Sequence, residues 1–440
     1  MACLSTSQDA ATLRLVMRAW HHEHPIFTFG SRGDVQPYVA LGAALRARGH
    51  AVTVSTGQGF DEMIESHGLA SAPASIDFRE IIKSKEMQAA LRSVSGKFKA
   101  MRAFKGLVRP QFEDMWEIAK DLRPDIIIYH PKGYVAQHIA EALKVVAIPT
   151  TLQPMFVPTG AFPNPVLPFR DLGQVGNRWT HSFLNWVSAK GQAWLIGKWR
   201  QERLGLAPKA QRAFFEGYDR QGREVPRLHG YSTQLVTKPH EWTEREHITG
   251  YWFLKPRRWQ PPEALAQFLQ AGPSPVYVGF GSMPAEDAKK QTQIVIDALR
   301  KSCQRGLLAT GWGGLAAVAN SDAIHVLDAA PHDWLFPRCA AVVHHGGAGT
   351  THEGLRWGRP TIICPLAVDQ PYWGRRVMEI GAGPKPIPQK HLNSEDLAAA
   401  LEAVKDPVMI ARAEKLGVAM RAEGGADDAA SVVETAVGQT

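Results

Sequence analysis

The stretch from Val342 to Trp373, VVHHGGAGTTHEGLRWGRPTIICPLAVDQPYW, decides the fold that we expect for this chain. An apolar run over residues 339–343 predicts a short buried strand, and a glycine-rich turn follows it. Residues 350–357 predict a helix with a hydroxyl near its N-cap, and residues 361–364 predict a second strand. Strand, helix and strand in this order form one βαβ unit of a parallel sheet.

The glycine-rich turn, Gly346-Gly347-Ala348-Gly349, has the properties of an anion site. Glycines let the backbone approach a ligand closely, and the first N–H groups of a helix have no partner within it. With the helix dipole they favour an anion by roughly 0.3–1 kcal/mol when exposed and up to about 2 kcal/mol when partly buried. We expect a phosphate or pyrophosphate here, with His345, protonated or as a hydrogen-bond donor, beside it.

An acid and an amide, Asp369 and Gln370, follow the second strand of this unit. The carboxyl ends of the strands are where open α/β sheets bind their ligands. A carboxylate beside an amide suits a polyhydroxyl group, so the ligand implied by the whole stretch is a phosphate joined to a sugar.

These residues resemble the donor-binding signature of nucleotide-sugar glycosyltransferases with two Rossmann-like domains, the GT-B kind. In that signature a His-x-Gly-x-x-Ser/Thr-x-x-Glu block is followed by an Asp-Gln pair. The matching positions are His345, Gly347, Thr350, Glu353, Asp369 and Gln370. From Phe27 to about Glu434 the chain looks most like sterol 3-β-glucosyltransferases and their bacterial relatives that glycosylate antibiotic aglycones.

The resemblance implies an α/β fold of the GT-B type, with two Rossmann-like parallel-sheet domains facing each other across a cleft. We expect residues 1–240 to bind the acceptor and residues 263–420 to bind the donor. Residues 241–262, dense in proline and aromatic side chains, are the expected linker. Residues 421–440 are expected to form a C-terminal helix that packs back on the N-terminal domain. A length of 440 residues agrees with more than one domain.

The donor contacts follow from the resemblance, position by position. Glu353 would hold the ribose hydroxyls, and the Asp-Gln pair would hold the sugar. Relatives stack a tryptophan on the base, but this chain has Ala329 at that position, so we assign the stacking to Trp312 instead. The expected donor-binding residues are Ser31, Arg32, Gly33, Gly281, Ser282, Trp312, Pro331, His332, Gly347, Ala348, Gly349, Thr350, Thr351, Glu353, Asp369 and Gln370.

Asp34 is the expected catalytic base, and His345 is the second expected catalytic residue. A first strand over residues 26–29 leads into the turn 30–37, which resembles the family's GTRGDVQP turn and precedes a helix expected from Tyr38. In plant relatives the equivalent turn carries the catalytic histidine. A carboxylate there can take the proton of an acceptor hydroxyl. The local sequence alone fits a helix-capping aspartate equally well, and the resemblance favours the base.

The acceptor side of the sequence is rich in aromatic residues. We expect Phe156, Phe162 and Trp179 to line a pocket for a flat hydrophobic alcohol. Trp179, Phe183 and Trp186 recur at helical spacing, which most often marks a buried core stripe, with an acceptor pocket or a membrane contact as the alternative.

A basic stretch adds a second candidate for membrane contact. Residues 97–109, KFKAMRAFKGLVR, hold five basic residues and no acidic one. This is the pattern of a helix on an anionic membrane surface or of a solvated helix packed on its own domain, and we place the second slightly ahead.

Composition excludes several other classes. The net charge of +8 fits anionic donors or anionic lipid, but the basic residues are otherwise dispersed, and we expect no nucleic-acid partner. Four scattered cysteines form no CxxC motif and suit a reduced, cytoplasmic compartment. P-loop, zincin and hydrolase-elbow motifs are missing. His21, His22 and His24 fit a frayed terminus better than a metal site, so we expect neither metal nor cofactor beyond the sugar donor.

By resemblance, we expect inverting transfer of glucose from UDP-glucose to a hydroxyl of a hydrophobic acceptor, foremost a sterol or similar polycyclic lipid. The first alternative is transfer to a natural-product aglycone such as a macrolide, glycopeptide, flavonoid or terpenoid. The second is a non-catalytic lipid- or membrane-binding protein that retains a relic donor site. A nucleotide-sugar epimerase or hydrolase on the same fold is a further enzyme class, which rapid conversion of UDP-glucose without acceptor would reveal.

Overall fold

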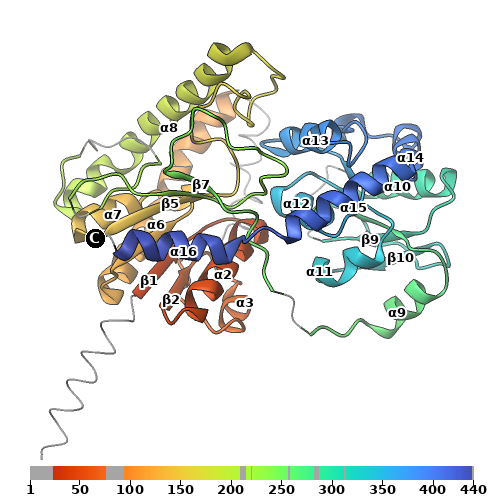
Figure 1. Ribbon diagram of the computed structural model, residues 1–440, viewed down its shortest axis with the longest axis horizontal. Coiled ribbons are helices and arrows are strands. Elements are labelled where there is room, and N and C mark those ends of the chain that lie inside the picture. Colours follow the sequence, from red (N-terminus) through yellow and green to blue (C-terminus); the bar gives the residue numbers. More distant parts are fainter. Residues whose placement is uncertain are drawn as a thin grey trace, which may run out of the picture.

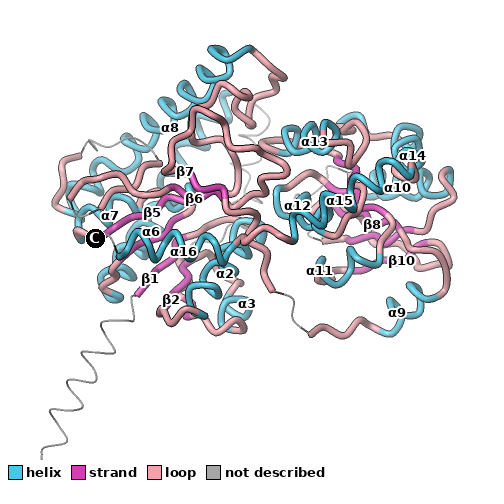
Figure 2. Tube along the Cα trace, in the orientation of Figure 1, coloured by secondary structure: helices cyan, strands magenta, loops and turns pink. Residues whose placement is uncertain are grey.

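The chain folds into two parallel sheets, each flanked by helices (Figures 1 and 2). The computed structural model describes residues 23–75, 94–208, 215–219, 221–255, 258–281, 287–311 and 314–438, with the backbone alone at 94–107 and 438. His21, His22, Ser282 and Trp312 therefore lie outside the described residues. Separate hydrophobic clusters pack on each of the two sheets and divide the molecule into an N-terminal and a C-terminal domain, and one further cluster contains residues of both.

The N-terminal domain contains a seven-stranded parallel sheet in the order β3-β2-β1-β4-β5-β6-β7. Its strands are β1 (Glu23–Phe27), β2 (Ala51–Ser55), β3 (Ala70–Ser71), β4 (Ile126–Tyr129), β5 (Val146–Thr151), β6 (Arg227–His229) and β7 (Glu246–Ile248). Its helices are α2 (Arg32–Ala47), α3 (Asp61–Glu65), α6 (Val94–Leu122), η1 (Pro131–Gly133), α7 (Ala136–Leu143) and α8 (Gly173–Leu204). Strand β4 reads IIIY and is buried throughout, as expected for a strand covered on both faces.

The C-terminal domain contains a five-stranded parallel sheet in the order β10-β9-β8-β11-β12. Its strands are β8 (Val276–Gly279), β9 (Gly306–Ala309), β10 (Ile324–Leu327), β11 (Ala341–His344) and β12 (Thr361–Ile363). Its helices are α9 (Glu263–Gln270), α10 (Ala288–Lys301), α11 (His332–Leu335), η2 (Phe336–Arg338), α12 (Ala348–Arg356), α13 (Gln370–Glu379), η3 (Gln389–His391), α14 (Ser394–Ala403) and α15 (Pro407–Arg421).

In both sheets the strand order reverses beside the first strand of the domain. Strand β1 lies between β2 and β4, and β8 lies between β9 and β11. Turns that leave the carboxyl ends of strands at such a switch point form the ligand crevice of open α/β sheets. The turns after β1 and β4 in one domain, and after β8 and β11 in the other, are therefore where the site should be found.

The segment expected to link the domains does more than connect them. Strand β7, at its start, pairs with β6 and completes the N-terminal sheet, so the crossing itself begins after Ile248. The last helix, α16 (Ala426–Gly438), packs against α2 and contributes Ala429, Ala430 and Val433 to the N-terminal core. An ion pair between Arg48 and Glu434, 2.7 Å apart, fixes it there. The chain thus crosses between the domains twice (Figure 1).

Candidate functional site

The turn after β1 differs from the expectation. Residues 32–37 are not an extended turn but the first turns of α2, which begins at Arg32, with Ser31 as its N-cap. Asp34 is therefore the third residue of the helix, and its carboxylate accepts hydrogen bonds from the Ser31 N–H at 2.8 Å and from the Ser31 hydroxyl at 3.0 Å. Asp34 does cap the helix, which confirms the capping alternative, and its role as a base stays a prediction.

The two carboxylate oxygens of Asp34 have different surroundings. Oδ2 receives both Ser31 bonds and lies 2.9 Å from Nζ of Lys132. Oδ1 has one close neighbour of opposite polarity, Nε2 of His130, at 3.8 Å. Burial would raise the pKa of Asp34, but Lys132, His130 and the Ser31 bonds outweigh it, so this pKa lies below its ordinary value. The carboxylate is ionised at neutral pH, with one oxygen available to accept a proton.

His130 and Lys132 were not among the residues singled out from the sequence. His130 follows β4, which pairs with β1 in register Phe27 to Tyr129, and the register brings the turns after both strands together. The Lys132 N–H donates to Nδ1 of His130 at 3.1 Å, so the ring proton lies on Nε2. Among the described residues Nε2 has no hydrogen-bond partner, and burial lowers the pKa of His130 to about 3. His130 is thus a neutral donor beside Asp34.

The turn after β11 leads directly into α12. The helix begins at Ala348, two residues before the expected start, and its N-cap is Gly347, without a side-chain cap among the described residues. The expected hydroxyl cap is wrong, because Thr351 Oγ1 donates to the carbonyl of Gly347 at 2.9 Å instead. Gly346 adopts φ +92°, a conformation that favours glycine. The N–H groups of Ala348, Gly349 and Thr350 are left for an external anion.

His345 lies at this helix end between two glycines. A Cβ atom on Gly281 would approach its ring to 2.6 Å, and a Cβ atom on Gly347 would do the same from the other side. Burial lowers the pKa of His345 to about 4, so of the two states considered from the sequence, the neutral hydrogen-bonding one applies near pH 7. Its Nδ1 has no partner within the described part of the chain.

Glu353 is buried two turns into α12 rather than in its first turn. Its Oε1 accepts from the indole N–H of Trp357 at 2.8 Å, and Arg356 lies 3.3 Å away. Burial raises the pKa of Glu353, although Arg356 and Trp357 oppose the shift. Burial, and then the negative charge of Glu353, raises the pKa of Tyr251.

Asp369 and Gln370 lie at the start of α13, and they have different partners. Asp369 accepts from the indole N–H of Trp373 at 2.8 Å, and burial raises its pKa to about 6. The side-chain carbonyl of Gln370 accepts from the N–H groups of Leu366 and Ala367, at 2.7 and 3.2 Å, and so closes the preceding loop. Val368, beside Asp369, has φ +59°, a strained value for a β-branched residue that fits a ligand-binding loop.

Pro331 and His332 complete the C-terminal part of the site. Pro331 is the N-cap of α11, and the ring of His332 stacks on Phe336 with 4.3 Å between centroids. Burial, then the charge of Arg32, lowers the pKa of His332 to about 3. Because Arg32 belongs to the N-terminal domain, this coupling places the two expected donor-binding segments next to each other.

The two helix N-termini meet at the domain interface. A Cβ atom on Gly349 would lie 3.9 Å from Cα of Gly33 and 3.0 Å from the hydroxyl of Tyr251. Tyr251, from the crossing segment, stacks on His352 at 4.5 Å and was also missed in the sequence, although its HITGYW context was recognisable. The charges of Asp34 and Lys132 act on Asp369. The residues expected to act as the base, to bind the diphosphate and to bind the sugar therefore lie at one site.

The three expected acceptor-binding residues have three different environments. Phe156 packs on Phe215 at 4.8 Å, and Phe162 packs on Tyr372 of the C-terminal domain at 5.6 Å. Trp179 points outward and is 60% exposed. The interpretation of the Trp179 stripe as buried core is wrong, and no contact within the described residues joins the three rings.

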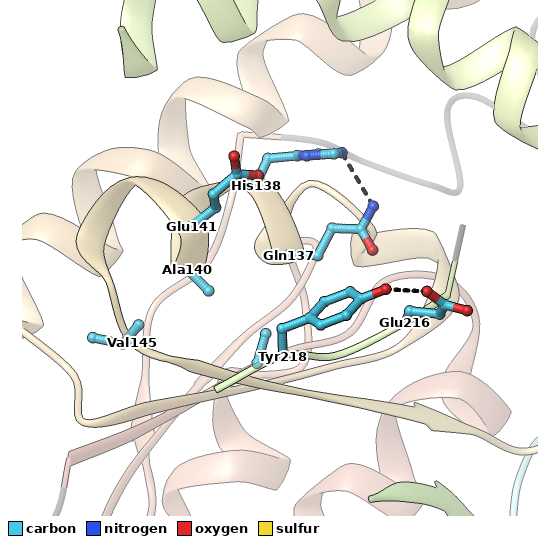
Figure 3. Close-up of a pocket in the computed structure, with 8 residues that line it drawn as sticks. Gln137, His138, Ala140, Glu141, Val145, Glu216 and Tyr218 are labelled. Atoms are coloured by element: carbon cyan, nitrogen blue, oxygen red, sulfur yellow. Dashed lines mark hydrogen bonds between the residues drawn. The ribbon is translucent and has the colours of Figure 1, made fainter. Parts of the chain in front are cut away.

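A separate small cavity lies in the N-terminal domain beside α7 (Figure 3). Its lining is Gln137, His138, Ala140, Glu141, Val145, Ala147, Glu216 and Tyr218. Its volume of about 10 Å³ is near the minimum for one water molecule, so a nucleotide sugar does not fit.

In the described residues, no cluster of three His, Cys, Asp or Glu side chains has the geometry of a metal site. None of the described helices has the length and apolar content of a membrane span.

Family models match both halves of the chain. Residues 26–159 match the glycosyltransferase family 28 N-terminal domain. Residues 314–435 match the C-terminal domain of the erythromycin biosynthesis protein CIII-like family.

Curated relatives extend the match over most of the chain. A sterol 3-beta-glucosyltransferase of Arabidopsis thaliana is 35% identical over 407 residues, covering 90% of this chain and 62% of the plant protein. A second Arabidopsis sterol 3-beta-glucosyltransferase is 34% identical, with 91% and 66% covered. The sterol 3-beta-glucosyltransferase of Neosartorya fischeri is 36% identical, with 90% and 28% covered. The chain thus spans less than two thirds of the length of these proteins.

Solved structures share the arrangement of the two domains. The glycotransferase of kitacinnamycin superposes with a TM-score of 0.71 at 19% identity, covering 94% of this chain and 99% of that one. The calicheamicin glycosyltransferase CalG4 gives 0.68 at 16% identity, with 95% and 99% covered. At this identity the structures establish the fold, and the family models and the curated relatives identify the family. The chain belongs to the glycosyltransferases of the GT-B fold.

Proposed function

We propose that this protein transfers glucose from UDP-glucose to the hydroxyl of a sterol or similar polycyclic lipid, with inversion at the anomeric carbon. The observation that carries the proposal is the meeting of two helix N-termini. One presents a carboxylate, Asp34, and the other presents uncapped N–H groups at Gly349, where an added Cβ atom would lie 3.9 Å from Cα of Gly33. A base facing a diphosphate site is what an inverting transfer needs.

The acceptor half of the mechanism uses Asp34 and His130. The acceptor oxygen would lie between Oδ1 of Asp34 and Nε2 of His130, whose separation of 3.8 Å allows one hydroxyl to contact both. The hydroxyl proton passes to Asp34, while the neutral His130 positions the oxygen. Lys132 stays on the other carboxylate oxygen and keeps the base ionised.

The donor half uses the start of α12. The acceptor oxygen forms a bond to the anomeric carbon as the bond from that carbon to the diphosphate oxygen breaks, and the electron pair leaves with UDP. The N–H groups of Ala348, Gly349 and Thr350, with neutral His345, offset the charge that grows on the diphosphate. Helix and histidine together supply this compensation, so the proposed mechanism needs no metal.

The choice of acceptor and donor comes from the relatives. Those reported above are named as sterol glucosyltransferases and match over about nine tenths of this chain. One solved neighbour, VinC, at 17% identity and TM-score 0.64, is described in complex with dTDP, so thymidine donors are the competing choice.

A donor-by-acceptor panel tests the proposal. We expect the highest turnover with UDP-glucose and a sterol, with mass spectrometry reporting one added hexose and NMR reporting a β-linked product. The panel includes dTDP-glucose, flavonoids, and macrolide and glycopeptide aglycones. Preferential turnover of an aglycone would mean that the acceptor is not a sterol. An α-linked product would contradict the role of Asp34 as base. Sugar release without acceptor would indicate a hydrolase.

A further inference from the structure

Helix α8 buries three polar side chains against its own domain. Asn177, Thr180 and His181 are buried. Asn177 donates to the carbonyl of Gly160 at 2.9 Å, the Thr180 hydroxyl accepts from the N–H of Asn164 at 2.8 Å, and His181 bonds the carbonyl of Phe162 at 3.1 Å. These bonds hold the loop before α8 and leave the inner face of the helix satisfied.

The opposite side of α8 is aromatic and exposed. Trp179, Phe183 and Trp186 are 60%, 43% and 59% exposed, and we call these three residues the aromatic face. Their rings stack in series, with 5.1 Å and then 6.4 Å between centroids. Further apolar side chains are exposed on α8 or in the loop that precedes it. They include Val166, Phe169, Leu172, Val175 and Val187. A surface helix of a soluble domain has the reverse arrangement, so this one is suited to an apolar phase outside the protein.

The charged side chains on this part of α8 are all basic. From Gly173 to Gln201 the helix has no acidic residue. Arg178 and Lys190 are exposed, and neither has an ion pair among the described residues. Lys190 follows Trp186 by four positions and so lies on the same stripe. Basic residues beside exposed tryptophans match the phosphate and acyl boundary of an anionic membrane.

The position of α8 leaves this surface accessible. The helix rises along the edge of the N-terminal domain, and one of its ends projects beyond the rest of the molecule at the top of Figure 1. A projecting helix can lie in the plane of a membrane without unfolding any other element.

We propose that the aromatic face of α8 inserts into the headgroup region of an anionic lipid bilayer, with Arg178 and Lys190 against lipid phosphates. The docking stands independently of catalysis. Its consequence, that a sterol-like acceptor is drawn directly from the bilayer, rests on the proposed function.

Vesicle flotation tests the docking. The full chain should float with vesicles of equal parts phosphatidylcholine and phosphatidylglycerol and much less with phosphatidylcholine alone. The triple variant Trp179→Ser, Phe183→Ser, Trp186→Ser should lose at least about tenfold in partitioning. The matched control Val408→Ser, Val418→Ser removes exposed apolar side chains from α15 and should float as the wild type does. Arg178→Gln with Lys190→Gln should weaken binding to the anionic vesicles only.

Further readouts separate the alternatives. UDP affinity and thermal unfolding of the triple variant should match the wild type, which shows that it folds. Turnover is measured with the double variant Phe183→Ser, Trp186→Ser, which keeps the expected acceptor residue Trp179. Its turnover should fall for acceptor embedded in vesicles but not for acceptor supplied in cyclodextrin. A triple variant that floats like the wild type, or a wild type that binds neither vesicle, would overturn the docking. So would a wild-type dimer in lipid-free solution that the triple variant dissociates, because a second copy then covers the face. A chain without transferase activity that still floats would remove the proposed function alone.

Discussion

The two helices that meet in the site, α2 and α12, begin in opposite ways. At α2 the third residue is Asp34, whose carboxylate accepts from the N-cap N–H, so the positive end of the helix is neutralised from within. At α12 the third residue is Thr350 and the N-cap is a glycine, so the same end stays open. The equivalent turns of the two domains thus differ in one respect. Helix α2 carries its own anion at its N-terminus, whereas the N-terminus of α12 is open to an anion from outside the chain.

The largest effect on this difference between α2 and α12 is expected from removing the negative charge of Asp34. Asp34→Asn keeps an oxygen that can accept from Ser31 but cannot take a proton, so we expect kcat to fall by about 10³-fold, within the usual range for a general base. UDP affinity, measured by calorimetry, should stay within about threefold, because α12 is untouched.

Ser31→Ala is the matched control for this substitution. It removes one hydrogen bond to Asp34 and retains the carboxylate, so stability should fall by about 1 kcal/mol, as for the loss of a cap, and kcat should fall far less than in Asp34→Asn. Wild-type turnover in Asp34→Asn would reduce Asp34 to a capping residue.

The reverse experiment makes α12 resemble α2. Thr350→Asp places a carboxylate at the third helical position, where it can occupy the open N–H groups and repel a diphosphate. We expect UDP affinity to fall by about 100-fold while thermal stability is kept or rises slightly. Thr350→Val, similar in size and uncharged, should lose less than about tenfold. Unchanged UDP binding in the aspartate variant would place the diphosphate elsewhere.

The pKa values of the site carboxylates in the two domains, Asp34 and Asp369, are shifted in opposite directions. The pKa of Asp34 lies below its ordinary value, whereas burial raises the pKa of Asp369 to about 6. A raised carboxyl pKa destabilises the folded state wherever the group is ionised, so stability is lost as pH rises from about 4 to about 6. Asp369→Asn should therefore stabilise the free protein by roughly 1–3 kcal/mol at pH 8.

The stabilisation by Asp369→Asn should disappear towards pH 4, which thermal unfolding at the two pH values measures. Asp322→Asn, at an exposed position, is the control and should show no such difference. A constant gain at both pH values would mean that Asp369 is not a strained acid.

The smallest expected effect concerns the pKa of Asp34, the proposed base. Lys132→Met removes the nearest positive charge from Asp34, so the pKa of Asp34 should rise and the acid limb of the kcat/KM profile should move to higher pH. At pH 7 the rate should change by less than about fivefold. Lys120→Met, which breaks an exposed pair with Glu117, should leave the profile in place.

Sequence patterns predicted the parts of the site that are local. The apolar runs and the glycines between His344 and Thr351 were sufficient for a strand, a turn and an anion-binding helix start. The helix boundaries were less well predicted, because Asp34 and Gly347 act as caps only in the folded geometry, and an RGDVQP sequence reads as a turn until its backbone is seen.

The residues missed from the sequence depend on strand order. His130 lies 96 positions after Asp34, and only the pairing of β4 with β1 brings it within 3.8 Å. Tyr251 reaches Gly349 only because the chain crosses between the domains at that point. Neither neighbour follows from local spacing, since pairing order is a property of the whole sheet.

The sequence by itself determined the class of fold, the glycine turn before α12 and the carboxylate at the start of α2, because each depends on residue types at fixed short spacings. Tertiary structure alone decided that Asp34 both caps its helix and offers a free oxygen to His130. It also decided that the Trp179 stripe faces outward, although the same helical spacing would fit a core. Periodicity specifies a face of a helix, but only packing against the rest of the chain specifies which face is buried.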